Sequence, residues 1–205
     1  MIRIAVVEDQ TLMRSALISL LDLEDDITVV GQSGRGEEVT QLVQDLGPDV
    51  LLLDIELPGQ SGLEALEDLH LSGAHEETDT HIIFVTTFAR AGYLRRAMDA
   101  GARGFLVKDD PVEKLAAAIR RVVAGETVID PLLAAQALSA GENPLSDREV
   151  QVLIASDGGT PVADIASALH LSPSTVRNYL SNAIGKMRAR NSAEALHSAR
   201  HEGWV

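Results

Sequence analysis

The chain has 205 residues, of which 45% are apolar and 23% charged, so it is long enough for one large domain or two small ones with a sizeable core. The absence of cysteine excludes disulfide frameworks, thiolate metal sites and cysteine nucleophiles. No apolar run approaches the roughly 18 to 20 residues of a membrane span, and the amino terminus is unlike a secretion signal. We therefore expect a cytoplasmic protein without a membrane partner.

The charge is spread unevenly along the chain. The net charge is −14, from 17 basic and 31 acidic side chains, which on its face argues against a polyanionic partner. Residues 1–125 hold 11 basic and 22 acidic side chains, a net charge of −11. Residues 172–200 hold five basic residues against Glu194 alone, a net charge of +4. The two ends of the chain therefore have different electrostatic characters.

Short apolar runs alternate with helical patterns through residues 1–125. The runs typical of buried strands are 2–7, 27–30, 50–53, 82–85 and 105–107. Apolar residues at helical spacing occupy 12–20, 39–46, 63–69, 94–98 and 112–123. Such alternation predicts an α/β, doubly wound, flavodoxin-like domain with a five-stranded parallel sheet covered on both faces.

Charged and hydroxyl side chains follow the predicted strands. Glu8 and Asp9 follow the first strand and Asp54 the third, whereas Thr86 and Lys108 close the fourth and fifth. The carboxyl ends of parallel strands meet at one sheet edge, where functional groups gather. Converging carboxylates repel one another, and a bound Mg²⁺ removes that conflict. We expect Asp9 and Asp54 to be ligands and Glu8 to arrange a water.

Asp54 is the candidate nucleophile because the central strand places it in the middle of this cluster. In-line attack on a phosphoryl group would give an acyl phosphate. Lys108 would supply a point charge to the phosphate and Thr86 a hydroxyl donor. Taken singly, an Asp at a strand end is most often a cap or turn residue and such a Lys is usually solvated. The combination of strand ends carries the prediction.

Residues 1–122 resemble a two-component receiver domain. The motifs that carry the resemblance are Val6 to Asp9, the segment 51–62 around Asp54, Val85 to Thr87, and the segment 101–108. The resemblance implies that a sensor histidine kinase phosphorylates Asp54. It also implies that Asp9, Asp54 and the backbone carbonyl of Glu56 hold Mg²⁺, and that Phe105 is an aromatic rotamer switch.

An enzyme of the haloacid-dehalogenase type is the alternative for this cluster. That family also uses a strand-end aspartyl nucleophile with Mg²⁺, but it requires a second Asp two residues on, where this chain has Glu56. No cap insertion follows, and 125 residues are short for that fold. We therefore expect no independent enzyme and slow or absent turnover of external phosphate esters.

The second part of the chain is predicted to be a small all-α domain. Helical periodicity ends at Gly125, and Pro131, Gly141 and Pro144 interrupt the segment that follows. We predict a first domain at 1–122, a linker at 123–142 and a second domain at 143–205. Capping and proline signals predict helices at 146–156, 162–169, 174–188 and 192–202.

The middle pair of these helices has the pattern of a helix-turn-helix, whose second helix would enter a DNA major groove. Ser174 and Thr175 can contact phosphates, Arg177 can bind guanine and Asn178 adenine. Three further residues complete the predicted DNA contacts: Ser181, Lys186 and Arg188. A plain three-helix packing module is the competing interpretation of the pattern.

The segments 143–150 and 175–182 resemble the LuxR/NarL-type (GerE) output domain. With the receiver, they identify the chain as similar to NarL/FixJ-family response regulators, which bind double-stranded promoter DNA and regulate transcription. A phosphorylation-independent DNA-binding regulator with a receiver-like scaffold remains the alternative function.

Weak binding by a single module, with about four phosphate contacts, makes a homodimer the expected DNA-binding form. Helices 11–21 and 111–124 have apolar residues almost all round, and the candidate interface residues are Leu12, Met13, Val112, Leu115, Ala116 and Ile119. The final helix, 193–201, is a second candidate, and a core role is the alternative for the apolar excess. Phosphorylated Asp54 would draw in Thr86, reorder Phe105 and favour the dimer. The six histidines are expected to be surface or capping residues.

Overall fold

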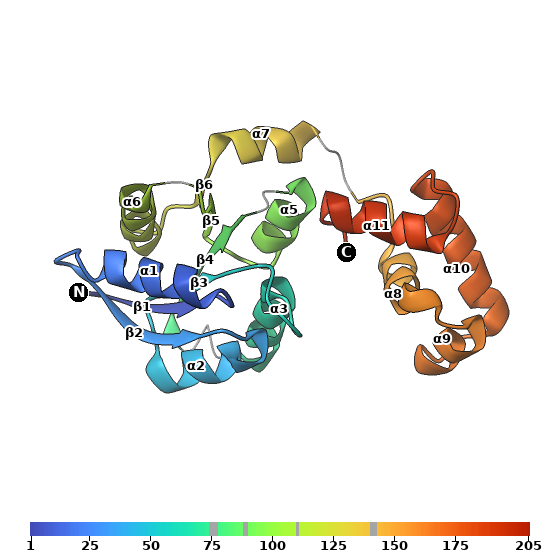
Figure 1. The fold of residues 1–205 in the computed structure, drawn as a ribbon, viewed down its shortest axis with the longest axis horizontal. Helices are drawn as coiled ribbons and strands as arrows, with labels where there is room; N and C mark the ends of the chain where they lie inside the picture. Colours follow the sequence, from blue (N-terminus) through green and yellow to red (C-terminus); the bar gives the residue numbers. More distant parts are fainter. Residues whose placement is uncertain (74–77, 88–89, 110, 140–142) are drawn as a thin grey trace. The chain divides into compact units, whose positions relative to one another are not determined.

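The computed structural model describes residues 1–73, 78–87, 90–109, 111–139 and 143–205. The chain divides into two compact units, which are considered separately: Met1–Ala89 with Leu94–Ala135, and Gln136–Val205 with Arg90–Tyr93. Figure 1 shows a sheet with flanking helices in the first unit and helices alone at the carboxyl end of the chain. Among the described residues, no helix combines the length and apolar character needed to cross a bilayer.

The sheet of the first unit is parallel throughout. Its strands are β1 (Ile2–Val7), β2 (Ile27–Ser33), β3 (Val50–Leu53), β4 (His81–Thr86), β5 (Gly104–Val107) and β6 (Val128–Ile129). Their order is β2-β1-β3-β4-β5-β6. The chain thus adds β2 on one side of β1 and then places β3 to β6 in succession on the other side. This confirms the predicted parallel α/β fold.

The predicted number of five strands is wrong, because β6 adds a sixth. β6 lies parallel to β5, with Gly104 opposite Val128 and Phe105 opposite Ile129. It has two residues and lies in the segment predicted as a linker, which also contains α7 (Pro131–Ser139). A two-residue strand is too short to have a detectable hydrophobic period. Residues 140–142 of the predicted linker lie outside the described residues.

Helices cover both faces of this sheet (Figure 1). They are α1 (Thr11–Leu21), α2 (Val39–Leu46), α3 (Gly62–Ser72), α5 (Ala91–Asp99) and α6 (Val112–Val123), with a 3-10 turn, η1 (Gly36–Glu38), before α2. One apolar cluster joins α1 and α6 to alternate residues of the strands, among them Val50 and Leu52. All four residues of β3 are buried, which explains why its sequence is apolar without alternation.

The second unit contains α8 (Asp147–Ala155), η2 (Asp157–Gly159), α9 (Val162–Ala168), α10 (Pro173–Lys186) and α11 (Ser192–Glu202). Two small apolar clusters hold it together, and Leu180 of α10 packs against both. Ser172 begins α10 by accepting a hydrogen bond from the Thr175 amide at 3.1 Å. Helix α10 ends two residues before the predicted Arg188, which adopts a φ of 52° beyond the helix.

A buried carboxylate connects the start of α8 to the end of α10. Glu149 is 3% exposed and completes a capping box with Ser146. The Lys186 ammonium donates to Glu149 Oε2 at 2.6 Å. Burial acts to raise the pKa of Glu149, but the hydrogen bonds from Lys186 and Ser146 outweigh it and the net pKa is lowered. Lys186 therefore contributes to the stability of the unit.

Replacing Lys186 by Met is expected to destabilise the second unit by roughly 1–3 kcal/mol at neutral pH, because a charged hydrogen bond to a buried carboxylate is lost. The pKa of Glu149 is lowered on folding, so its contribution is present above the unfolded-state pKa and is lost as pH falls through the folded-state pKa. The difference between the two proteins should therefore shrink in acid. Urea unfolding followed by fluorescence of Trp204, the single tryptophan, measures it.

Arg190→Met is the matched control, because Arg190 forms an exposed i,i+4 pair with Glu194 and its side chain is 87% exposed. It should change the urea midpoint little. Equal losses in the two variants would contradict a special role for the Lys186–Glu149 pair.

Candidate functional site

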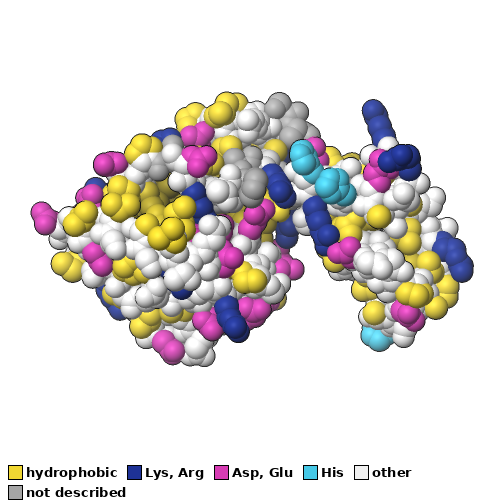
Figure 2. Space-filling model, in the orientation of Figure 1, with side chains coloured by type: hydrophobic (Ala, Val, Ile, Leu, Met, Phe, Trp, Pro, Cys, Tyr) yellow, Lys and Arg dark blue, Asp and Glu magenta, His cyan; other side chains and the backbone are white. Residues whose placement is uncertain are grey.

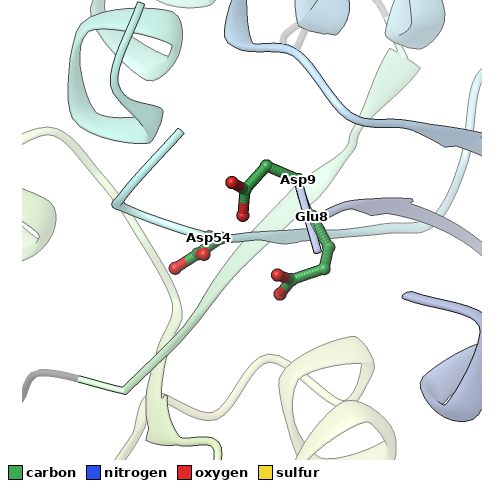
Figure 3. Close-up of side chains that lie close together, drawn as sticks. All are labelled: Glu8, Asp9 and Asp54. Carbon is green, nitrogen blue, oxygen red and sulfur yellow. The ribbon is translucent and has the colours of Figure 1, made fainter. Parts of the chain in front are cut away.

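Three carboxylates meet at the carboxyl ends of β1 and β3. Glu8 and Asp9 follow β1, Asp54 follows β3, and the pairing of Val7 with Leu53 brings the two strand ends together. A ligand oxygen from each of the three side chains lies within 4.8 Å of the others (Figure 3). Glu8 and Asp54 are 2% and 3% exposed, whereas Asp9 is exposed. The predicted convergence of these strand ends is present.

Lys108 lies between the two buried carboxylates. Its ammonium is 2.5 Å from Glu8 Oε2 and 2.7 Å from Asp54 Oδ2, and the Lys108 side chain is 2% exposed. Lys108 directly follows β5, and its amide donates to the Thr86 carbonyl at 2.9 Å. The ends of three strands are therefore joined by one buried cation.

The electrostatics of this cluster are those of carboxylates removed from water. Burial raises the pKa of Glu8 and of Asp54, with Lys108 acting in the opposite direction on both. Burial also acts to lower the pKa of Lys108, but its two carboxylate partners raise it overall. One ammonium does not fully compensate two buried carboxylates and a third beside them. An oxygen cluster of this kind suits a hard divalent cation.

The other predicted residues of this edge lie close to the cluster. Thr86, at the end of β4, is fully buried. Phe105, in β5, is also fully buried and lies 6.2 Å from Phe84 between ring centroids. Glu56 has an exposed side chain, and its amide donates to Asp54 Oδ1 at 3.4 Å. Phe105 thus has its ring inside the protein.

A glycine allows α3 to begin beside Asp54. A Cβ added at Gly62 would lie 1.9 Å from the Asp54 carbonyl oxygen, so a side chain there would force the backbone to move. Ser61 caps α3 and forms a capping box with Glu64. The close approach of the α3 start therefore fixes the main chain that carries Asp54.

Arg14 is a residue of this site that the sequence analysis missed. Its guanidinium donates through Nη1 to the backbone carbonyl of Glu8 and through Nε to Gln32 Oε1, the latter at 3.2 Å. It therefore ties α1 to the main chain that leads from Glu8 to Asp9. The available signal was a single cation within an otherwise apolar and small-residue helix pattern.

The predicted dimer residues differ in their exposure. Leu12 is 85% exposed, and Met13 and Val112 are half-buried. Leu115, Ala116 and Ile119 are between 0% and 6% exposed and belong to the core that α6 forms with the sheet. The prediction that these three form an interface is therefore wrong, since they already pack inside the protomer. Replacing Leu115 by aspartate would therefore place a charge in the core of the first unit, and it would test folding rather than dimerisation.

An apolar hollow lies between α1 and α6. Its volume is about 130 Å³, and it is lined by side chains from both helices and from the strands beneath, including Met13, Leu17, Leu20, Val112 and Lys108. The exposed Leu12 belongs to the same helix as three of these residues. The first unit therefore has a hollowed apolar surface between α1 and α6, and Lys108 is one of the residues that line it.

The predicted DNA contacts fall on α10 and just beyond it. Ser174, Arg177, Asn178 and Ser181 are exposed, and Thr175 is half-buried. The Lys186 ammonium forms an ion pair with Glu149 of the same unit, so it also has a role in the stability of the fold. Ser172 also lies 2.8 Å from the Ser174 hydroxyl and 2.7 Å from that of Thr175. One exposed helix thus presents an arginine, an asparagine and several hydroxyls.

Comparisons with known families cover nearly the whole chain. The response regulator receiver domain matches residues 4–120, and the luxR family of bacterial regulatory proteins matches residues 143–199. The transcriptional regulatory proteins YvfU and DesR of Bacillus subtilis (strain 168) are 44% and 43% identical to it. These matches cover all of this chain, all of YvfU and 99% of DesR.

The structure is similar to the crystal structure of the response regulator ChrA of a heme-sensing two-component system. The TM-score is 0.56 at 28% identity, and the match covers 100% of this chain and 98% of that one. The predicted resemblance to the NarL/FixJ family is confirmed by both domain matches and by these relatives. The chain belongs to the two-component response regulators in which a receiver domain is joined to a LuxR-type DNA-binding domain.

Proposed function

We propose that a sensor histidine kinase phosphorylates Asp54 and that the phosphorylated protein dimerises and binds promoter DNA in the cytoplasm. The observation that carries this proposal is the buried ammonium of Lys108 held between Glu8 and Asp54, beside the exposed Asp9. Carboxylates at the ends of two neighbouring strands are costly to bury, whereas they suit a cation and a phosphoryl group. The domain boundaries that we propose are 1–122, 123–142 and 143–205.

The carboxylates of Asp9 and Asp54, together with the backbone carbonyl of Glu56, would hold Mg²⁺, with Glu8 arranging one of its waters. The donor set fits, because it consists of oxygens and includes the buried carboxylate of Asp54, with the buried carboxylate of Glu8 beside it; burial raises the pKa of both. Bound there, Mg²⁺ would supply positive charge that offsets the phosphoryl oxygens.

Phosphorylation forms one bond and breaks one. A carboxylate oxygen of Asp54 attacks phosphorus in line, an O–P bond forms, and the P–N bond of the kinase phosphohistidine breaks. The imidazole leaves with the electron pair of that bond and takes up a proton. Lys108 keeps its contact with Glu8 and exchanges Asp54 for a phosphoryl oxygen, which the Thr86 hydroxyl also contacts. We assign no independent phosphatase activity to the chain.

The switch that we propose runs from Asp54 through Thr86 and Phe105 to the surface between α1 and α6. Thr86 lies beside Lys108 at the strand ends, and Phe105 lies three residues before Lys108 in the same segment. In the dimer, a second copy would cover this surface, which includes the exposed Leu12 and the half-buried Met13 and Val112. The phosphoryl group can shift the equilibrium between monomer and dimer only by as much free energy as it stabilises the dimeric state over the monomeric one.

On DNA, α10 is the helix that we place in the major groove. Arg177 would bind guanine and Asn178 adenine, with Ser181 nearby, while Ser174 and Thr175 would contact phosphates. Arg188, just beyond the helix, and Lys186 would lie along the backbone. Few cations are available, so binding by one copy should be weak and strongly dependent on salt.

Incubation with a small acyl phosphate and Mg²⁺ is expected to add one phosphoryl group, detected by intact mass. Asp54→Asn should abolish the adduct, whereas Asp25→Asn, at an exposed position in a loop, should retain it. An adduct that survives in Asp54→Asn, or no adduct in the native protein, would contradict the assignment of Asp54.

Electrophoretic shifts with and without the phosphodonor then separate a phosphorylation-dependent regulator from a phosphorylation-independent one, whose affinity for DNA would not change.

Leu12→Asp is expected to abolish the phosphorylation-dependent dimer in sedimentation while leaving the phosphoryl adduct intact, because it places a charge on the proposed apolar interface. Leu71→Asp is the matched control, since Leu71 on α3 is 86% exposed, compared with 85% for Leu12. The control should dimerise normally. A normal dimer in Leu12→Asp would place the interface elsewhere, for example on α11.

Arg14→Ala is expected to slow phosphorylation by about tenfold, within the range that a small misplacement of a reacting group causes. The half-saturating Mg²⁺ concentration should also rise, because Arg14 holds the main chain next to Asp9. Arg14→Lys should be intermediate, and Arg103→Ala, at an exposed arginine, should behave as the native protein. A fall in stability with an unchanged Mg²⁺ dependence would show that Arg14 has no positioning role.

A further inference from the structure

Helix α11 carries two histidines one turn apart. His197 and His201 are four residues apart, so their side chains lie on the same face of the helix, with Cβ atoms about 5–6 Å apart. Both residues are exposed, and the His201 side chain is 75% exposed. Figure 2 shows histidine side chains gathered on the surface over α11.

The helix that carries them is held firmly. Asn191 caps its start by accepting a hydrogen bond from the Glu194 amide at 2.9 Å, and Gly203 ends it in the left-handed conformation. Ala195, Leu196 and Ala199 are buried in the apolar cluster beneath. The two imidazoles are therefore presented on a preorganised backbone, which lowers the entropy lost when they share one ligand.

Carboxylates lie beside the histidine pair and beside the arginines of the same helix region. Arg190 is bound to Glu194 at 2.9 Å and Arg200 to Asp157 at 2.8 Å, so a carboxylate offsets each of these two guanidinium groups. The Arg90 guanidinium donates to the backbone carbonyl of Arg200 at 2.8 Å. The Glu202 carboxylate lies 3.7 Å from His201 Nδ1. A metal ion at the imidazoles would therefore have a carboxylate beside His201, and carboxylates offset the positive charges of Arg190 and Arg200.

We propose that His197 and His201 form a binding site for a transition-metal cation of the imidazole-preferring class, which includes Ni²⁺, Cu²⁺ and Zn²⁺. Two histidines one helical turn apart are a recurrent ligand pair for such ions, and water would fill the remaining positions. This site differs in ligand chemistry from the oxygen cluster at Asp54, which suits Mg²⁺. It also revises the expectation that all the histidines are merely surface or capping residues.

Isothermal titration of the untagged full-length protein with Ni²⁺ in saturating Mg²⁺ tests the proposal. Mg²⁺ keeps the oxygen cluster occupied, and one Ni²⁺ is expected to bind at α11. His197→Ala and His201→Ala should each weaken binding by about tenfold or more, as loss of a ligand requires. His170→Asn, at another exposed histidine of the same unit, should bind as the native protein does; asparagine suits its φ of 53°.

Two double variants test the spacing. His201→Ala combined with Ala193→His places imidazoles at 193 and 197, again four residues apart at exposed positions, and should restore binding. His201→Ala combined with Glu202→His leaves them five apart and should not. In parallel, Ni²⁺ should raise the thermal midpoint reported by Trp204 in the native and restored proteins but not in the variant whose histidines are five residues apart.

Three results would overturn the proposal. One is the absence of Ni²⁺ binding by the native protein. Another is binding that survives both single alanine variants, or that Asp54→Asn removes instead. The third is equal binding by the pairs spaced four and five residues apart, because a helical site depends on the face that the two side chains share.

Discussion

The ammonium of Lys108, held between Glu8 and Asp54, is the interaction on which the first unit depends. It joins the carboxyl ends of β1, β3 and β5, which are separate in sequence and contribute one charged side chain each. Two carboxylates buried without this cation would be strongly destabilising. The same charges that we propose for the reaction of Asp54 therefore also join the strand ends, so the fold of the unit and its proposed chemistry depend on the same three side chains.

The parallel sheet and the convergence at its edge could be predicted because buried strands give continuous apolar runs and parallel strands end at one edge. Strand β6 could not, since Val128 and Ile129 alone have no period. The dimer residues failed for another reason. Periodicity shows that one face of α6 is apolar but not whether it covers the sheet or a partner, and Leu115 and Ile119 cover the sheet.

Single polar residues were the hardest to predict. Arg14 could not be predicted as a site residue because a single cation on an apolar helix forms no recognisable sequence motif. Its role depends on the backbone carbonyl of Glu8, which only the folded chain brings close to it. Lys186 was predicted to meet DNA from its place on the recognition helix. Its partner, Glu149, is 37 residues away in sequence, so the contact depends on the packing of α10 on α8. Long-range pairs of this kind are invisible to local patterns.

Gly185 has a consequence for how proteins of this kind diverge. It lies exposed within α10, and a Cβ there would meet no heavy atom within 4 Å among the described residues. Helix-interior glycine weakens a helix by about 1 kcal/mol relative to alanine, and nothing in the packing of α10 requires it. A single codon change at this position can therefore add a side chain to the exposed surface of α10 without repacking the domain. If α10 enters the major groove as we propose, two copies that arise by gene duplication could come to prefer different DNA sites through this residue while retaining the same fold.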